Sequence, residues 1–323
     1  MNKPKVFIAE EIPEETEKYI AKYCDYEIWN NEERIPREIL LQKLADKDGV
    51  MLTGNKVDEE LLSYAPNLKV VSNITVGYNN FDIEAMKKRR VIGTNTPYVL
   101  DDTVADLILG LMLSASRKIA ELDRYVKDNK WLSSDGKNLF GLDVHHAVLG
   151  IIGMGRIGEA VARRAKLGFD MEVMYYNRSR KLKTEEELGV QYTGLNSLLE
   201  KSDFIVLMTP LTEDTFHLID TEEFNKMKST AIFINASRGQ TVNEKALIEA
   251  LESKKIYAAG LDVYDSEPIN GDNKLLKMPN VVTLPHIGSA TEKTRIDMSN
   301  LAAENLVKGA LGEIPKNIVP EFK

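Results

Sequence analysis

The sequence of 323 residues has little cysteine and no excess of positive charge. Its one cysteine, Cys24, cannot form a disulfide within the chain and offers no thiolate cluster to a metal ion. A net charge of −8 argues against a nucleic-acid partner, because phosphate contacts need clustered lysine and arginine. A membrane-spanning helix needs about 20 consecutive apolar residues, and no apolar run in the sequence is that long. The N-terminal segment is too acidic for a signal peptide. We therefore expect a cytoplasmic protein without a membrane partner or a metal site.

Hydrophobic residues make up 43% of the chain and charged residues 28%, which is typical of a globular protein. Apolar segments alternate with amphipathic ones, as in parallel sheets covered by helices. The predicted strands are Lys5–Ala9, Gly49–Thr53, Lys69–Asn73, Val148–Ile152, Glu172–Tyr176, Asp203–Met208, Ala231–Asn235, Tyr257–Leu261 and Val281–Leu284. The predicted helices include Glu14–Tyr23, Pro36–Ala45, Asp58–Tyr64, a long helix from Asp102 to about Asn129, Arg156–Leu167 and a final helix over Ala290–Leu311.

This pattern predicts an α/β fold with two doubly wound, Rossmann-like parallel-sheet domains and a cleft between them. The final helix has no strand of its own, so we expect it to return to the first domain. The expected domains are a flavodoxin-like substrate-binding domain, residues 1–97 plus 288–323, and a dinucleotide-binding Rossmann domain, residues 98–287.

The strongest single motif is VLGIIGMGRIG, an apolar strand that ends in Gly153, Gly155 and Gly158. The first glycine permits a tight turn, the second lets the backbone approach a pyrophosphate, and the third lets the next helix pack close to the strand. Arg156 and Ile157 open that helix, whose free N–H groups face the phosphates. A strand before the motif and a helix after it favour a dinucleotide site over a simple glycine-rich turn.

The loop after the next strand reads Asn177, Arg178, Ser179, Arg180 and Lys181, where a site that prefers NAD usually carries an acid. Arginine can bind a 2′-phosphate through two hydrogen bonds. The loop therefore predicts NADP(H) as the preferred cofactor and leaves NAD(H) possible, while a solvated basic turn is the alternative.

Polar side chains follow three consecutive predicted strands of the second domain. Arg238 ends one strand and could bind a carboxylate and polarise a carbonyl. Asp262 and Glu267 follow the next strand, and either acid could orient a base. His286 follows the last strand. Because such strand ends share one edge of a sheet, we expect an active site there rather than a chance grouping.

The chain resembles the D-2-hydroxyacid dehydrogenase family over essentially its whole length. The motifs that carry the resemblance are VLGIIGMGRIG, INASRG, GLDVYDSEP and LPHIGSAT. Within the family it is most similar to the glyoxylate/hydroxypyruvate reductases and the 2-ketogluconate reductases, from SNITVGYNNFD, the NRSRK loop and PHIGSATEKTR. The D-3-phosphoglycerate dehydrogenases, often with a C-terminal regulatory domain, match less well.

The resemblance implies that Arg238 binds the substrate's carboxylate and keto oxygen, that His286 donates the proton in reduction, and that Glu267 hydrogen-bonds His286. It also implies that backbone N–H groups of Val76 and Gly77 hold the substrate carboxylate. The further implied positions lie along the cofactor, namely Thr103, Thr209, Pro210, Ala236, Asp262 and Gly288, and near the substrate, namely Ser289 and Trp131. Trp131 could reach a partner in a homodimer.

The resulting prediction is an NADPH-preferring reductase of small 2-keto acids, glyoxylate or hydroxypyruvate, that yields glycolate or D-glycerate. A 2-ketogluconate reductase shares the same catalytic residues and stays an alternative. An alternative of another class is a nucleotide-sensing binding protein or corepressor on the same fold.

Overall fold

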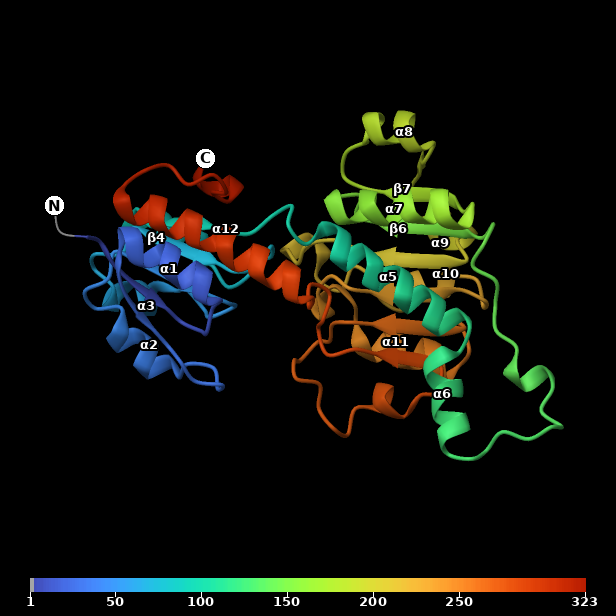
Figure 1. The fold of residues 1–323 in the computed structure, drawn as a ribbon. Helices are drawn as coiled ribbons and strands as arrows, with labels where there is room; N and C mark the ends of the chain where they lie inside the picture. The colour runs from blue at the N-terminus through green and yellow to red at the C-terminus, as the bar shows by residue number, and fades with distance from the viewer. Residues whose placement is uncertain (1–2) are drawn as a thin grey trace. The chain divides into compact units, whose positions relative to one another are not determined.

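The computed structural model describes residues 3–323, which divide into two compact units (Figure 1). The first unit comprises the described residues up to Leu100 together with Ala290–Lys323, and the second is Asp101–Ser289. Each unit contains one sheet whose strands are all parallel, covered by helices. The predicted α/β class with two Rossmann-like sheets is confirmed.

The sheet of the first unit has the order β2-β1-β3-β4-β5, which is the flavodoxin-like order. Its strands are β1 (Lys5–Ile8), β2 (Asp25–Ile28), β3 (Gly49–Leu52), β4 (Val70–Asn73) and β5 (Ile92–Thr94). Its helices are α1 (Glu14–Tyr23), α2 (Arg37–Lys43), α3 (Glu59–Tyr64), α4 (Ile83–Arg89) and α12 (Glu292–Leu311), with the 3₁₀ turn η5 (Pro320–Phe322) at the end of the chain.

The two faces of this sheet are covered by different helices. Leu40 of α2, Leu61 of α3 and Met86 of α4 pack in one buried cluster with Val50 and Val71 of the strands. The other face meets α12, which contacts β3 and β4 and packs beside α1 (Figure 1). A Cβ at Gly309 would lie 2.6 Å from the Cβ of Val70, so glycine lets α12 pack this closely on β4. The final helix thus covers a sheet formed by the start of the chain.

The sheet of the second unit has the order β12-β11-β10-β9-β6-β7-β8. Its strands are β6 (Val148–Ile152), β7 (Glu172–Tyr176), β8 (Gln191–Tyr192), β9 (Phe204–Leu207), β10 (Ile232–Asn235), β11 (Ala258–Leu261) and β12 (Val281–Thr283). The order reverses between β6 and β9. Ligands of such sheets bind at that reversal, outside the carboxyl ends of the strands.

Helices again cover both faces of this second sheet. They are α5 (Asp101–Ser116), α6 (Ile119–Lys127), α7 (Arg156–Phe169), α8 (Leu182–Leu188), α9 (Leu195–Lys201), α10 (Thr221–Lys226) and α11 (Glu244–Glu252), and the short 3₁₀ turns are η1 (Lys137–Leu139), η2 (Glu213–Thr215), η3 (Gly239–Thr241) and η4 (Lys274–Lys277). Leu198 of α9, Phe224 of α10 and Leu247 of α11 pack in one cluster with Phe233 and Leu261. On the opposite face α5 packs against α7 and contacts β10 and β11.

The long helix predicted from Asp102 to about Asn129 is wrong, because the chain breaks into α5 and α6. Lys118 lies between them in the left-handed region, with a φ of 56°. The carbonyl of Ser116 accepts a hydrogen bond from Leu142 N–H (2.8 Å), so a returning segment uses the group that would have continued the helix. Gly141 allows that approach, since a Cβ there would lie 2.3 Å from the Ser116 oxygen.

Three short strands have no counterpart in the predicted pattern. They are β2, with alternately exposed residues, β5, with three residues, and β8, with two exposed residues. Segments this short contain too few residues for a periodicity to be read, and their pairing to a neighbouring strand makes them strands. Among residues 3–323, the helices are all too short or too polar to cross a bilayer.

Candidate functional site

The glycine-rich turn between β6 and α7 has the geometry of a nucleotide cradle. Gly153 has a φ of +104°, and a Cβ there would lie 2.7 Å from the carbonyl oxygen of Met208. A Cβ at Gly158 would lie 2.6 Å from the Gly153 oxygen, whereas the space beside Gly155 is open. The hydroxyl of Thr209, which follows β9, is buried and has no hydrogen-bond partner within residues 3–323. These features fit a dinucleotide, with room for a pyrophosphate at Gly155 and a polar group to receive it.

The side chain of Arg156 is bound by α5. Its Nε donates to Asp101 of α5 at 2.9 Å. Burial raises the pKa of Asp101, and the neighbouring Arg156 charge opposes that rise. Arg156 and Ile157 form the first turn of α7, and the N-terminal turn of a helix is where a phosphate can be bound by backbone N–H groups.

The basic loop after β7 is held by a hydrogen bond within the loop and by another to α8. Asn177 Nδ2 donates to Ser179 O at 3.1 Å, and Arg180 Nε donates to Glu185 of α8 at 3.1 Å. Glu185 also accepts from the Tyr175 hydroxyl at 2.6 Å, and these partners together hold its pKa below the usual range. Arg178 is exposed. The loop thus presents one exposed arginine beside a second arginine that a carboxylate orients.

His286 and Glu267 form a direct pair: His286 Nδ1 lies 2.7 Å from Glu267 Oε2. The other carboxylate oxygen of Glu267 accepts from Tyr264 N–H at 3.1 Å. Burial raises the pKa of Glu267, but the hydrogen bond and charge of His286, the Tyr264 N–H and the charge of Arg238 outweigh it, and the pKa lies below the usual range. An ionised Glu267 fixes the imidazole ring through Nδ1 and leaves Nε2 to act on a ligand.

Arg238 lies three residues after the end of β10 and is half-buried. Its Nη1 donates to Ser237 O at 2.6 Å. Burial lowers the pKa of this guanidinium, and the charge of Glu267 works in the opposite direction. The carbonyl of Arg238 accepts from Asn235 Nδ2 (3.0 Å) and Thr241 Oγ1 (2.6 Å), so the turn that presents the arginine is fixed.

The loops that carry Arg238, Glu267 and His286 brace one another. A Cβ at Gly239 would lie 1.7 Å from the carbonyl oxygen of Tyr264, so the loops after β10 and β11 are in backbone contact there. The buried Tyr264 hydroxyl donates to Leu284 O at 2.9 Å, two residues before His286. Burial raises the pKa of Tyr264 to about 12, so the hydroxyl remains a donor. Sequence reasoning missed Tyr264, because an aromatic residue after a strand is indistinguishable from a packing residue.

Asp262 holds the loop of His286 through hydrogen bonds to its backbone. It is 1% exposed, and its two oxygens accept from Ile287 N–H and Gly288 N–H, each at 2.8 Å. Burial raises the pKa of Asp262, and these two N–H groups lower it in part. His286 itself has a φ of 53°, a region that non-glycine residues seldom adopt. The two hydrogen bonds hold the loop in this conformation.

The remaining predicted residues are spread over both units. Val76 and Gly77 lie in the first unit, in the loop after β4, while Thr103 is the third residue of α5. Trp131 is 67% exposed in the segment after α6. The others lie in loops after strands of the second sheet, namely Pro210 after β9, Ala236 after β10, and Gly288 and Ser289 after β12. These residues therefore lie in loops at the carboxyl edge of the second sheet.

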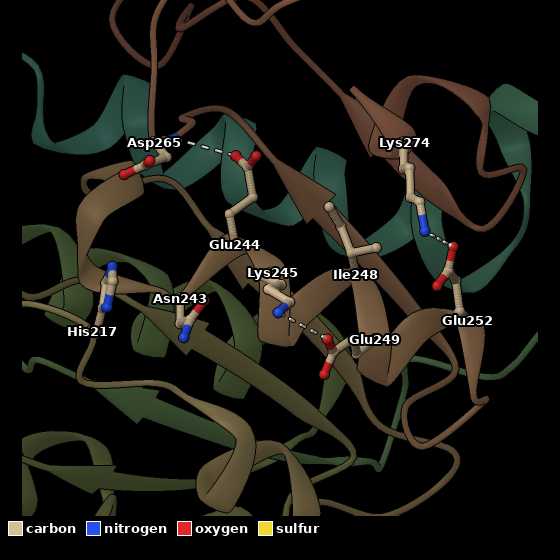
Figure 2. A pocket seen from close by; sticks show the side chains of 9 residues that line it. All are labelled: His217, Asn243, Glu244, Lys245, Ile248, Glu249, Glu252, Asp265 and Lys274. Carbon is tan, nitrogen blue, oxygen red and sulfur yellow. Dashed lines mark hydrogen bonds and ion pairs between the residues drawn. The ribbon is translucent and has the colours of Figure 1, made fainter. Parts of the chain in front are cut away.

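A hollow of about 550 Å³ lies along α11, apart from the predicted site residues (Figure 2). Two ion pairs lie along it, Lys274 with Glu252 at 2.9 Å and Lys245 with Glu249 at 3.9 Å. Glu244 accepts from Asp265 N–H at 3.3 Å and so braces the loop that carries Glu267. Figure 2 shows Glu244 pointing up to that loop. Within residues 3–323, His, Cys, Asp and Glu form no group of three or more that could hold a metal ion.

Comparison with known proteins agrees with this geometry. Residues 109–288 match the family described as "D-isomer specific 2-hydroxyacid dehydrogenase, NAD binding domain". The chain is 44% identical to a glyoxylate reductase of Korarchaeum cryptofilum over 98% of this chain and 96% of that one. It is 49% identical to a glyoxylate/hydroxypyruvate reductase B of Escherichia fergusonii over 86% of each chain.

A solved structure also resembles this one over nearly its whole length. It is an NADPH-dependent glyoxylate/hydroxypyruvate reductase of Sinorhizobium meliloti in complex with NADP and malonate. The TM-score is 0.86 at 28% identity, and the match covers 99% of this chain and 98% of that one.

The lowered pKa of Glu267 predicts a pH-dependent stability. A carboxylate whose pKa in the folded protein lies below the ordinary glutamate value of 4.5 stabilises the fold above that pH, and the contribution is lost as the pH falls through the lower folded pKa. We expect the stability advantage of the wild type over Glu267→Gln to be constant near neutral pH and to shrink below pH 4.5. Urea midpoints measured across this range test it. Glu252→Gln, which breaks the exposed pair with Lys274, is the control, and an advantage of Glu267 that grows on acidification contradicts the prediction.

Proposed function

Because the chain belongs to the D-isomer-specific 2-hydroxyacid dehydrogenase family of oxidoreductases, we propose that it reduces small 2-keto acids, with NADPH as the preferred reductant. The proposed substrates are glyoxylate and hydroxypyruvate, and the products are glycolate and D-glycerate. The observation that carries this proposal is the His286–Glu267 pair, 2.7 Å apart, at the same sheet edge as Arg238 and the glycine cradle.

The proposed chemistry divides among three side chains. Arg238 binds the substrate carboxylate and polarises the keto oxygen, for which its charge and N–H groups are suited. His286 donates a proton from Nε2 to the keto oxygen, while Glu267 holds the ring in place through Nδ1. A bound reduced nicotinamide would supply the hydride for the keto carbon. The same groups act in reverse in oxidation, where neutral His286 accepts the proton.

Further contacts are part of the proposal. Backbone N–H groups of Val76 and Gly77 bind the carboxylate, and Ser289 and Trp131 lie near the substrate. The residues proposed to line the cofactor are Gly153, Gly155, Arg156, Ile157, Gly158, Asn177, Arg178, Ser179, Arg180, Thr103, Thr209, Pro210, Ala236, Asp262 and Gly288. The buried hydroxyl of Thr209 supports this set, since a bound cofactor would give it a partner.

Two alternatives receive less support. The relatives described above are named as glyoxylate or hydroxypyruvate reductases, which favours a small keto acid over 2-ketogluconate. A nucleotide-sensing binding protein needs no proton donor, so the His286–Glu267 pair favours an enzyme. We also propose that the enzyme works in the cytoplasm.

Replacing His286 tests the activity and the proton donor together. We expect the wild-type protein to consume NADPH with glyoxylate or hydroxypyruvate. His286→Ala is expected to lower kcat by about 10²–10⁴-fold, because the proton donor is lost. Its NADPH Kd is expected to stay within about threefold of wild type, because the cofactor cradle remains. Loss of NADPH absorbance and a fluorescence titration measure the two quantities. The exposed His145→Ala is the control. No consumption with either acid or with 2-ketogluconate contradicts the enzyme proposal, and normal kcat in His286→Ala removes its role.

The cofactor preference is proposed to depend on Arg178 and Arg180. One charge-assisted hydrogen bond to a phosphate contributes about 1.5–3 kcal/mol, which is about 10–100-fold in Kd, so the double variant Arg178→Ala, Arg180→Ala is expected to raise the NADPH Kd by at least that factor. The NADH Kd is expected to change by less than about threefold, because NADH lacks the 2′-phosphate. Lys183→Ala, an exposed lysine of α8, is the matched control. Equal weakening of both cofactors contradicts the assignment.

We propose a homodimer formed through the segment from α6 to Phe140. Helix α6 has no buried residue, and the segment exposes Ile119, Val126, Trp131, Leu132 and Phe140, each by more than half. An apolar cluster of this kind marks an interaction surface. Sedimentation velocity is expected to show a dimer for the wild type and a monomer for Val126→Asp, Phe140→Asp. A monomeric wild type contradicts the proposal.

A further inference from the structure

The loop after β4 has three successive carbonyl groups, each with a hydrogen-bond donor. Thr75 O accepts from Thr96 N–H at 3.0 Å, and Val76 O accepts from Asn95 Nδ2 at 2.7 Å. Gly77 O accepts from Asn73 Nδ2 at 2.9 Å and from Thr75 Oγ1 at 2.6 Å. Each of these three peptide groups is thus fixed in rotation by its carbonyl.

A fixed carbonyl also fixes the N–H group of the same peptide. In a planar trans peptide the N–H points opposite to the C=O. Each of these three carbonyls is held by a hydrogen-bond donor. The N–H groups of Val76, Gly77 and Tyr78 therefore point away from those donors. Within residues 3–323 these three N–H groups have no acceptor.

The donors themselves are rigidly placed. Asn73 and Thr96 are fully buried, and Asn73 Nδ2 also lies 2.8 Å from Thr75 Oγ1. The backbone of Asn95 is held on both sides, since its N–H donates to Asn317 O at 3.2 Å and its carbonyl accepts from Asn305 Nδ2 at 3.3 Å. Asn95 directly follows β5 and Asn73 ends β4, so both amides are attached to neighbouring strands of one sheet.

Successive N–H groups without acceptors form an anion-binding site, and a carboxylate oxygen is the acceptor that suits them. We propose that Asn95 and Asn73 are positioning residues, which hold the Thr75–Tyr78 backbone so that its N–H groups bind the substrate carboxylate. This inference rests on the proposed function and extends it, because it assigns side chains that orient the contact without touching the substrate. The role predicts weaker substrate binding with little change in the chemical step when a donor is removed.

Steady-state kinetics of two variants test the proposal. Asn95→Ala frees the Val76 carbonyl, and we expect KM for glyoxylate to rise about tenfold while kcat and the NADPH Kd change by less than about threefold. The inhibition constant of oxamate, a carboxylate of similar shape, is expected to rise in parallel. Thr75→Val removes one of two donors to Gly77 O and is expected to raise both constants about threefold, so it carries the test if Asn95→Ala does not fold.

The control is Asn300→Ala, which breaks a hydrogen bond of 2.5 Å with Thr16 between α12 and α1 in the same unit. It is expected to lower the thermal midpoint without changing KM. Unchanged KM and oxamate constants in the folded positioning variants overturn the proposal, as does a change in KM equal to that of Asn300→Ala. If the wild type reduces no keto acid, the proposed function fails. Calorimetric titration of oxamate into the wild type and the variants, each in the presence of NADPH, then still decides whether Asn95 orients an anion site.

Discussion

The parallel pairing of β10, β11 and β12 is the constraint on which the candidate site depends. In a parallel sheet all strands run in the same direction, so their carboxyl ends lie at one edge of the sheet. The residues that follow these three strands therefore lie at that edge. Asn235 pairs with Leu261, and Leu261 pairs with Thr283, which brings the loops of Arg238, Glu267 and His286 together over a sequence distance of about fifty residues. The backbone hydrogen bonds between these strands thereby set the coarse geometry of the candidate site.

Hydrogen bonds between loops then refine that geometry. Tyr264 contacts Glu267 through its N–H and the carbonyl of Leu284, just after β12, through its hydroxyl, while Asp262 holds the two N–H groups after His286. Each of these bonds involves a buried or half-buried group, for which an unsatisfied partner would be costly. The same principle operates in the first unit, where Asn73 and Asn95 hold the carbonyls of a loop. Both units thus use buried or half-buried side chains to fix the backbone of their loops.

Several of these features were predictable from sequence. Apolar runs followed by glycine, arginine or histidine identified the main strands and the residues after them, because a buried parallel strand and the turn that ends it are both local patterns. The break after Ser116 was not predictable, since it depends on Leu142, which returns to the Ser116 carbonyl. Glu185 was also missed as a partner of Arg180, because their meeting depends on how α8 packs.

The sequence by itself determined the alternation of strands and helices, the glycine cradle and the chemical identity of Arg238, Glu267 and His286, since each is carried by residues close together in the chain. Only the tertiary structure decided which partner each group has. It joined Glu267 to His286 Nδ1, turned Arg156 toward Asp101 and oriented Arg180 by Glu185. The physical reason is that a local pattern specifies conformation, whereas a hydrogen bond or ion pair between distant residues depends on the packing that brings them within about 3 Å.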